Sequence, residues 1–235
     1  MSGAAVVPSD RRHQPSSRLA LIDASDELAK ALRDCLSQPG LQLVPIAGSE
    51  AFAKKKFEGF VVDLRNANAE EILETIRSSA RNRRAVLFGV YSDPSEVRRS
   101  SKYGINGLFL WPIRRADVLR VVRAAQTLLW HELRRYARIP LATEVELIVN
   151  QQTFHGVSRE ISGGGMSINF SKLPKAIKAE KAEVKFVVPP GRVVTLHGDV
   201  CWVYEDDNLL GVKFLPEPEP LVPVRAWIDD YLGIS

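Results

Sequence analysis

Two short segments of the sequence carry side chains that suit the binding of a phosphate-bearing ligand. Residues 134–138 read Arg-Arg-Tyr-Ala-Arg, and residues 160–165 read Glu-Ile-Ser-Gly-Gly-Gly. A guanidinium group donates two parallel hydrogen bonds to a planar pair of acceptors, such as two phosphate oxygens or the edge of a purine. Glycine lets a ligand approach the backbone where a Cβ atom would obstruct it. The alternative interpretation is a solvated linker followed by a simple turn.

Around these segments, apolar and polar residues alternate with the period of β-strands. The expected strands cover residues 144–149, 153–158, 166–170, 182–188, 193–204 and 209–214. Many short strands separated by Gly and Pro turns indicate an antiparallel sandwich or barrel. A helix is expected over residues 222–232, where Val224, Trp227, Ile228 and Tyr231 share a face that can plug or flank the barrel.

The two segments together resemble the signature of the PilZ family. Residues 134–138 contain its RxxxR element, and residues 160–165 stand where the family has (D/N)xSxxG. Residues 198–203 and 211–214 also look like the later strands of the family. The resemblance covers about residues 132–235. It implies an antiparallel six-stranded β-barrel with a C-terminal helix that binds cyclic di-GMP.

Under this resemblance, three arginines in a flexible segment wrap a guanine dinucleotide that carries two phosphates. Arg134 and Arg138 are expected to donate to the guanine edges, and Arg135 adds a phosphate contact. Ser162 is expected to bond a phosphate or a base edge. Gly165 is expected to leave room for the ligand beside the backbone.

Glu160 departs from the family signature, which has Asp or Asn at this position. A carboxylate there would accept hydrogen bonds from guanine N1–H and N2–H. Glu160 keeps the charge but places it one methylene farther out, and a displaced contact is a weaker one. We therefore expect this substitution to weaken or abolish that contact.

The first half of the chain alternates strands with helices. Strands are expected over residues 19–22, 41–46, 60–64, 85–90 and 107–110, and helices over residues 26–35, 49–56, 69–77 and 94–102. This alternation predicts an α/β fold of the flavodoxin-like kind, a five-stranded parallel sheet covered on both faces. Chemistry in that architecture collects at the carboxyl ends of the strands, where Asp23 and Asp63 stand. Capping and turn formation are their alternative roles.

Residues 18–125 resemble the receiver domain of two-component response regulators. Asp63 closes the third strand at the position of the family's phosphoacceptor, and Asp23 stands where the acidic metal-binding pair begins. The resemblance implies a domain that is phosphorylated on an aspartate with the help of Mg²⁺.

Three departures from the receiver signature predict that this chemistry is lost. Ala24 replaces the second acidic residue, Val90 ends the fourth strand in place of Ser or Thr, and Trp111 replaces the lysine that precedes a proline. Phosphoryl transfer depends on a metal and a cation that neutralise the developing charge. We therefore expect a pseudo-receiver without a metal, in which Asp63 is not phosphorylated in a regulated way.

One continuous helix is expected to link the two halves from residue 116 onward. Its apolar stripe continues past the receiver-like core to Leu128, Leu129, Trp130 and Leu133, which are expected to need another surface. That surface is either the second domain or a second copy of the chain.

The bulk properties of the 235-residue chain are consistent with these domains. The predicted organisation is a disordered tail at residues 1–17, a receiver-like domain at residues 18–127 and a PilZ domain at residues 128–235. Cys35 and Cys201 are the only cysteines and lack disulfide or zinc spacing. No apolar stretch approaches the roughly 20 residues of a membrane helix, and the first apolar patch precedes its basic residues, unlike a signal peptide. These features predict a cytoplasmic protein.

The sequence predicts a signalling protein rather than an enzyme. Its four histidines show no metal or triad spacing, and its glycine run lacks the Lys and Ser/Thr of a phosphate-binding loop. We expect a cyclic di-GMP effector that has a protein partner or forms a homodimer through the receiver-like domain or the linking helix. Neither nucleic acid nor a membrane span is expected. The alternative is an adaptor that docks a protein without cyclic di-GMP.

Overall fold

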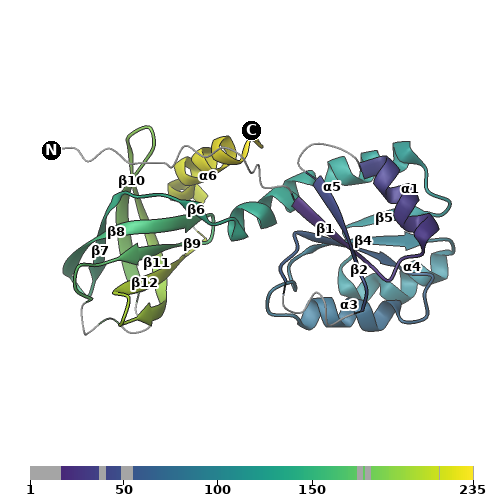
Figure 1. Ribbon diagram of the computed structural model, residues 1–235, viewed down its shortest axis with the longest axis horizontal. Coiled ribbons are helices and arrows are strands. Elements are labelled where there is room, and N and C mark those ends of the chain that lie inside the picture. The colour runs from purple at the N-terminus through teal and green to yellow at the C-terminus, as the bar shows by residue number, and fades with distance from the viewer. Residues whose placement is uncertain are drawn as a thin grey trace. The chain divides into compact units, whose positions relative to one another are not determined.

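The described chain folds as two compact units. The computed structural model describes residues 17–36, 41–48, 55–173, 177, 181–216 and 218–234. Contacts divide the chain between Leu133 and Arg134, and helices alternate with strands in the first unit, whereas strands dominate the second (Figure 1). The predicted domain boundaries stay predictions. The predicted tail lies outside the described residues except for Ser17, which begins a strand.

The first unit contains a five-stranded parallel sheet. Its strands are β1 (Ser17–Ile22), β2 (Leu41–Ile46), β3 (Gly59–Asp63), β4 (Val86–Tyr91) and β5 (Gly107–Leu110). The strand order is β2–β1–β3–β4–β5, and every neighbouring pair is parallel. This is the doubly wound, flavodoxin-like order, in which ligands bind at the carboxyl ends of β1 and β3. The predicted fold of the first half is therefore confirmed.

Helices cover both faces of this sheet. They are α1 (Asp26–Leu36), α3 (Ala69–Ser78), α4 (Pro94–Ser100), the 3₁₀ helix η1 (Ser101–Tyr103) and α5 (Arg115–Tyr136). The helix predicted over residues 49–56 falls mainly on residues 49–54, which lie outside the described residues. Within the described ranges, no helix combines the length and the apolar run that crossing a bilayer requires.

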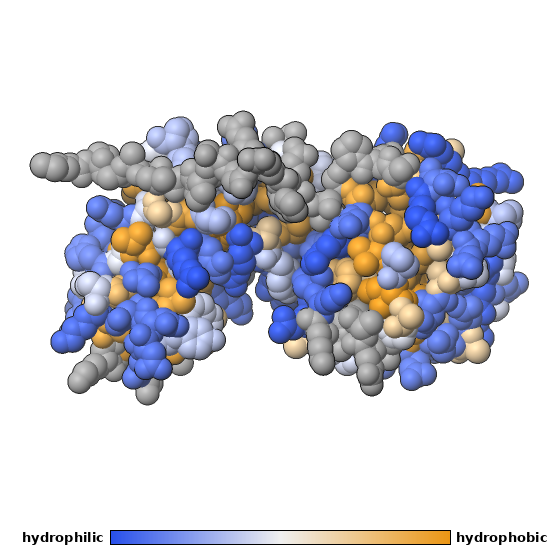
Figure 2. Space-filling model, in the orientation of Figure 1, coloured by the Kyte–Doolittle hydropathy of each residue, from blue (hydrophilic) through white to orange (hydrophobic). Residues whose placement is uncertain are grey.

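Alternating side chains of the sheet feed two separate cores. In β1, Leu19 and Leu21 pack into one core with α1 and α5, whereas Ala20 and Ile22 pack into the other with α3. Successive side chains of a strand point to opposite faces, so a strand buried on both faces must be apolar throughout. Every residue of β3 is buried, because helices cover both faces of the sheet (Figure 1). Hydrophilic residues form most of the outer rim of each unit (Figure 2).

The second unit is a closed antiparallel barrel. Its six long strands are β7 (Glu144–Val149), β8 (Gln152–Ser162), β9 (Gly165–Asn169), β10 (Lys181–Val188), β11 (Arg192–Tyr204) and β12 (Leu209–Phe214). They follow the order β8–β7–β10–β11–β12–β9, and pairing of β8 with β9 closes the barrel. The short strand β6 (Ile139–Pro140) adds to β8, and α6 (Pro218–Leu232) packs against β10 and β11 (Figure 1). The predicted six-stranded barrel with a C-terminal helix is confirmed.

Strand β8 and helix α5 both extend beyond their predicted ends, and both extensions carry site residues. Strand β8 continues past a bulge near Ser158, because β9 pairs with its last residues. Glu160 and Ser162 are therefore strand residues. Helix α5 continues to Tyr136, so Arg134 lies in a helical turn and not in the flexible segment that we expected.

The apolar stripe of α5 belongs mostly to the first unit. Leu129 is 2% exposed and lies in the same core as Leu19 and Val118. The prediction that it needs a surface beyond the receiver-like core is therefore wrong. Gly59 explains the difference, because a Cβ atom there would lie 3.1 Å from the Leu129 side chain, so the glycine gives the helix room against the sheet. Leu128 is 47% exposed, and dimerisation through this helix stays a prediction.

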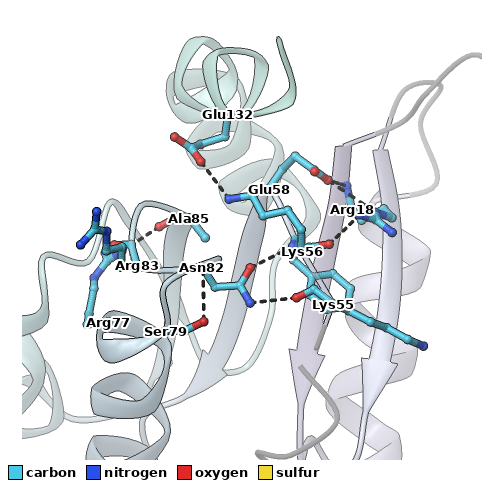
Figure 3. Close-up of polar contacts among 11 residues, drawn as sticks. Arg18, Lys55, Lys56, Glu58, Arg77, Ser79, Asn82, Arg83, Ala85 and Glu132 are labelled. Carbon is cyan, nitrogen blue, oxygen red and sulfur yellow. Dashed lines mark hydrogen bonds and ion pairs between the residues drawn. The ribbon is translucent and has the colours of Figure 1, made fainter. Parts of the chain in front are cut away.

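A buried ion pair joins α5 to the sheet near the start of β3. Lys56 Nζ lies 2.9 Å from Glu132 Oε2, and the two side chains are 12% and 6% exposed (Figure 3). Beside it, the Asn82 side chain accepts from the Phe57 amide and donates to the Lys55 carbonyl. These bonds fix the backbone on both sides of Lys56, so they help to position Lys56 for its ion pair with Glu132.

The neighbouring carboxylate, Glu58, is almost completely buried. Its Oε2 accepts from the backbone amide of Arg18 at 2.7 Å. Burial nevertheless raises the pKa of Glu58, because desolvation outweighs the favourable contacts with Arg18. This end of the first unit therefore depends on several matched polar contacts in a low-dielectric setting.

We predict that Lys56→Met destabilises the first unit by about 3 kcal/mol, because it leaves Glu132 buried without its cation. Hydrogen exchange of the β1 and β3 amides in increasing urea measures this loss locally. Asp117→Asn is the control, because the Asp117–Arg120 pair is exposed and worth about 0–1 kcal/mol. Equal protection in Lys56→Met and in the wild-type chain would show that the pair contributes nothing.

Candidate ligand-binding site

Backbone pairing holds the arginine segment against the end of β8. The amide of Gly163 donates to the carbonyl of Arg134 at 2.8 Å. Farther along, Ile139–Pro140 pairs with Glu160–Ile161. Residues from the RxxxR element and from the Ser-Gly turn, which lie more than 20 positions apart in the sequence, are therefore neighbours in the second unit.

A cleft of about 230 Å³ opens beside this junction. Its lining residues are Arg135, Tyr136, Arg138, Ser162, Gly164, Gly165, Met166, Cys201, Trp202, Gly211, Val212 and Lys213. Three of these residues are cations and, among the described lining residues, none is acidic. The cleft therefore combines an aromatic surface with positive charge, which suits a ligand that has both rings and phosphates.

The two outer arginines of the RxxxR element are engaged by carboxylates of the chain itself. The guanidinium of Arg134 forms a two-pronged pair with Asp229 of α6, in which Nε faces Oδ1 and Nη2 lies 2.9 Å from Oδ2. Arg138 Nη1 lies 3.8 Å from Glu160 Oε1, and both side chains are partly exposed. Of the predicted binding residues, Arg135, Arg138, Ser162 and Gly165 line the cleft, whereas Arg134 and Glu160 do not.

Arg135 is held differently from its neighbours. Its guanidinium lies over the ring of Tyr136, 5.9 Å from the ring centre. In the described chain, no carboxylate pairs with it. It therefore offers its donors to the cleft more freely than Arg134 or Arg138.

Ser162 contributes to the turn as well as to the cleft. Its side chain is buried, and its hydroxyl donates to the Gly165 carbonyl and accepts from the Gly164 amide, both at 3.2 Å. The hydroxyl proton is thus committed to the turn, while an oxygen lone pair can still accept. Ser162 therefore shapes this edge of the cleft before any ligand arrives.

Among the glycines of the turn, Gly165 is the one that packing requires. A Cβ atom on Gly165 would lie 2.3 Å from the carbonyl oxygen of Val212 on the neighbouring strand. At Gly163 and Gly164 the nearest atoms, in Arg134 and Arg135, would lie at 3.2 and 3.3 Å. Gly165 is therefore needed for β9 to pair with β12, whether or not a ligand binds.

Trp202 and Lys213 line the cleft but were not predicted as site residues. Trp202 stands opposite Gly211 across β11 and β12, and a Cβ atom on that glycine would lie 2.1 Å from the indole. The Trp202 ring also lies 5.0 Å from that of Tyr204. In the sequence, the one signal for Trp202 was a glycine that could pair with it on the neighbouring strand. Recognising that pair requires the strand register, which the sequence alone did not provide.

At the carboxyl end of the first sheet, Asp63 is paired with an arginine of the same unit. Asp63 is 4% exposed and is bonded to Arg65 through Nε–Oδ1 at 2.8 Å and Nη2–Oδ2 at 2.7 Å. The guanidinium of Arg65 also lies 4.4 Å from the ring centre of Trp111. The hydrogen bond to Asp63 raises the pKa of Arg65, so this cation stays charged.

Asp23 has a separate partner. Its Oδ1 accepts from the Gly48 amide at 2.8 Å, which stabilises the loop after β2. Across the described residues, no group of three or more His, Cys, Asp or Glu side chains is placed to hold a metal ion. Arg65 is therefore the cation that neutralises Asp63 in the described part of this unit.

The comparisons with known proteins match the two units separately. The PilZ domain family matches residues 132–232, so the second unit is a PilZ domain. The sequence-based prediction of this family is confirmed. Among curated proteins, no relative matches the chain.

Solved structures resemble each half of the chain. The chemotaxis response regulator CheY4 of Vibrio cholerae is 15% identical, with 46% of this chain and 97% of that chain covered and a TM-score of 0.41. A response regulator from Thermotoga maritima is 19% identical, with 48% and 98% covered and a TM-score of 0.40. The PilZ domain of CeSA from a cellulose-synthesising bacterium is 17% identical, with 42% and 97% covered and a TM-score of 0.33.

We predict that Gly165→Ala lowers the stability of the barrel by about 1–3 kcal/mol, because its Cβ atom would collide with the backbone of β12. Hydrogen exchange of the β9 and β12 amides in urea measures the effect. Gly164→Ala is the matched control, with an expected loss below about 1 kcal/mol. If both variants were equally stable, the close approach of β9 to β12 would not require glycine.

Proposed function

We propose that the PilZ domain binds cyclic di-GMP at the cleft and that the chain is a signalling receptor and not an enzyme. The observation that carries the proposal is that Arg135, Arg138 and Lys213 line one cleft together with Trp202, inside a domain that matches the PilZ family. A cytoplasmic location remains a prediction from the sequence.

The chemistry of the cleft accounts for both parts of such a ligand. The indole of Trp202 offers a face on which a base can stack, which is worth about 1–3 kcal/mol per base in nucleic-acid complexes. The forks of Arg135 and Arg138 can pair with phosphate oxygens or with O6 and N7 of guanine. Lys213 adds a charge that suits a phosphate.

The cleft is smaller than the whole ligand requires. Its volume of about 230 Å³ lies below the roughly 300–1,000 Å³ of common small-molecule pockets. It therefore accommodates only part of the dinucleotide, and the rest must lie over the arginine segment. Arg134, Arg138 and Glu160 would have to exchange their present partners for the ligand in that process.

The first unit serves as an interaction module in this proposal. Arg65 occupies both oxygens of Asp63, so a phosphodonor would meet a neutralised and buried carboxylate. Loss of the metal and of the activating cation removes most of the driving force for phosphoryl transfer. A protein partner or a second copy of the chain is then the expected ligand of this unit.

One observation favours the alternative, an adaptor that acts without cyclic di-GMP. Arg134 and Arg138 already have carboxylate partners, Asp229 and Glu160, so two of the three arginines of the segment are paired without a ligand. In that case the same barrel surface would dock a protein.

We expect wild-type protein to bind cyclic di-GMP in calorimetry, and Arg138→Ala to weaken binding at least about tenfold, because a two-pronged arginine contact is worth about 1–3 kcal/mol. Arg192→Ala is the control, since it removes the same charge from an exposed position outside the cleft. No heat at saturating ligand would refute the proposal and favour the adaptor.

We expect no phosphoryl group on Asp63 after incubation with acetyl phosphate and Mg²⁺, because Arg65 engages both of its oxygens. Intact-mass spectrometry measures the outcome, and Asp63→Asn provides the baseline. A phosphoryl adduct that appears in the wild-type protein and is absent from Asp63→Asn would contradict the pseudo-receiver assignment.

A further inference from the structure

We propose that Asp229 of α6 is an intramolecular competitor of the ligand, a carboxylate that occupies the fork of Arg134 until cyclic di-GMP displaces it. This inference rests on the proposed function. It adds a residue outside both signature segments and makes α6 the element that responds to binding.

The carboxylate of Asp229 presents the acceptor pattern that Arg134 would seek in the ligand. Its two oxygens face Nε and Nη2 of the guanidinium, and two parallel bonds of this kind are the geometry by which arginine binds a phosphate or the O6 and N7 edge of guanine. One guanidinium edge cannot serve both acceptors. Binding of the ligand through this Nε–Nη2 edge of Arg134 therefore requires that Asp229 leave.

The Arg134–Asp229 ion pair is buried enough to form and exposed enough for a ligand to displace the carboxylate. The side chains of Arg134 and Asp229 are 18% and 20% exposed. Partial shielding strengthens a pair relative to a fully exposed one, yet neither charge would be stranded in a dry interior after separation. A ligand with compensating phosphates can thus replace the carboxylate without a large desolvation penalty.

The two partners are anchored on different elements of the second unit. The carbonyl of Arg134 accepts from the Gly163 amide, so its backbone stays with the turn when the side chain is released. Asp229 follows the buried Ile228 on a helix that also buries Val224 and Leu232. Release of Asp229 therefore removes the polar restraint on α6 while its apolar contacts with the barrel remain.

Such competition sets the apparent affinity. The observed Kd equals the intrinsic Kd divided by the fraction of molecules in the competent state. If the Arg134–Asp229 pair is formed in about 90% of the molecules, the observed Kd rises about tenfold. The chain would thus bind cyclic di-GMP at a higher ligand concentration than it would without the competing carboxylate of Asp229.

Calorimetry of the full chain with cyclic di-GMP tests the competition. Asp229→Asn keeps the size of the side chain and removes its charge, and we expect it to bind about three- to tenfold more tightly than the wild type. Asp230→Asn is the matched control, because this neighbour on α6 is exposed, and its affinity should stay within about twofold of the wild type.

The outcomes separate the two proposals. Tighter binding by Asp229→Asn alone supports the competition. If the wild type binds and Asp229→Asn binds equally or more weakly, the competition is overturned and the proposed function stands. If none of the three proteins binds, the proposed function fails and the competition falls with it.

A measurement on the unmodified chain guards against misfolding of the variant. Hydrogen exchange of the α6 amides near Asp229 should become faster when cyclic di-GMP saturates the wild type, while the barrel strands become slower. Unchanged or slower exchange in α6 under saturation would overturn the release of this helix.

Discussion

The hydrogen bond from the Gly163 amide to the Arg134 carbonyl is the constraint on which the site depends. It fixes the end of α5 to the turn between β8 and β9, and so determines which way the following arginines point. Two contacts stabilise this turn. The Ser162 hydroxyl donates to the Gly165 carbonyl across it, and Gly165 lets β9 lie against β12. The cleft is thus a product of barrel closure, and its cations are positioned by backbone bonds rather than by side-chain contacts alone.

Both units neutralise their own reactive groups. In the first, Arg65 forms an ion pair with Asp63, and in the second, Asp229 forms an ion pair with Arg134. The energetic consequences differ, because Asp63 is 4% exposed whereas the side chain of Asp229 is 20% exposed. Breaking an ion pair that is more deeply buried costs more, so the Asp63–Arg65 pair is harder to separate than the Asp229–Arg134 pair.

The sequence predicted the strands well because their burial follows a strict period. β2, β5, β7 and β12 begin and end at the predicted residues. The parallel sheet follows from the alternation of strands and helices, whereas the six-stranded barrel was predicted from the resemblance to the PilZ family, without its strand order. What could not be predicted depends on tertiary distance. Asp229 lies 95 residues from Arg134 and carries no local signal, and the contribution of Trp202 depends on the register that places it opposite Gly211. The core position of Leu129 likewise depends on the missing side chain of Gly59.

The lining of the cleft by Cys201 has a practical consequence. The chain has two cysteines, and the other one, Cys35, is buried, which raises the pKa of its thiol and lowers its reactivity. Cys201 is exposed beside Trp202, so a thiol-specific reagent reaches it first. The native chain therefore carries one exposed cysteine for a fluorophore or a spin label in the lining of the cleft, without the need to engineer one.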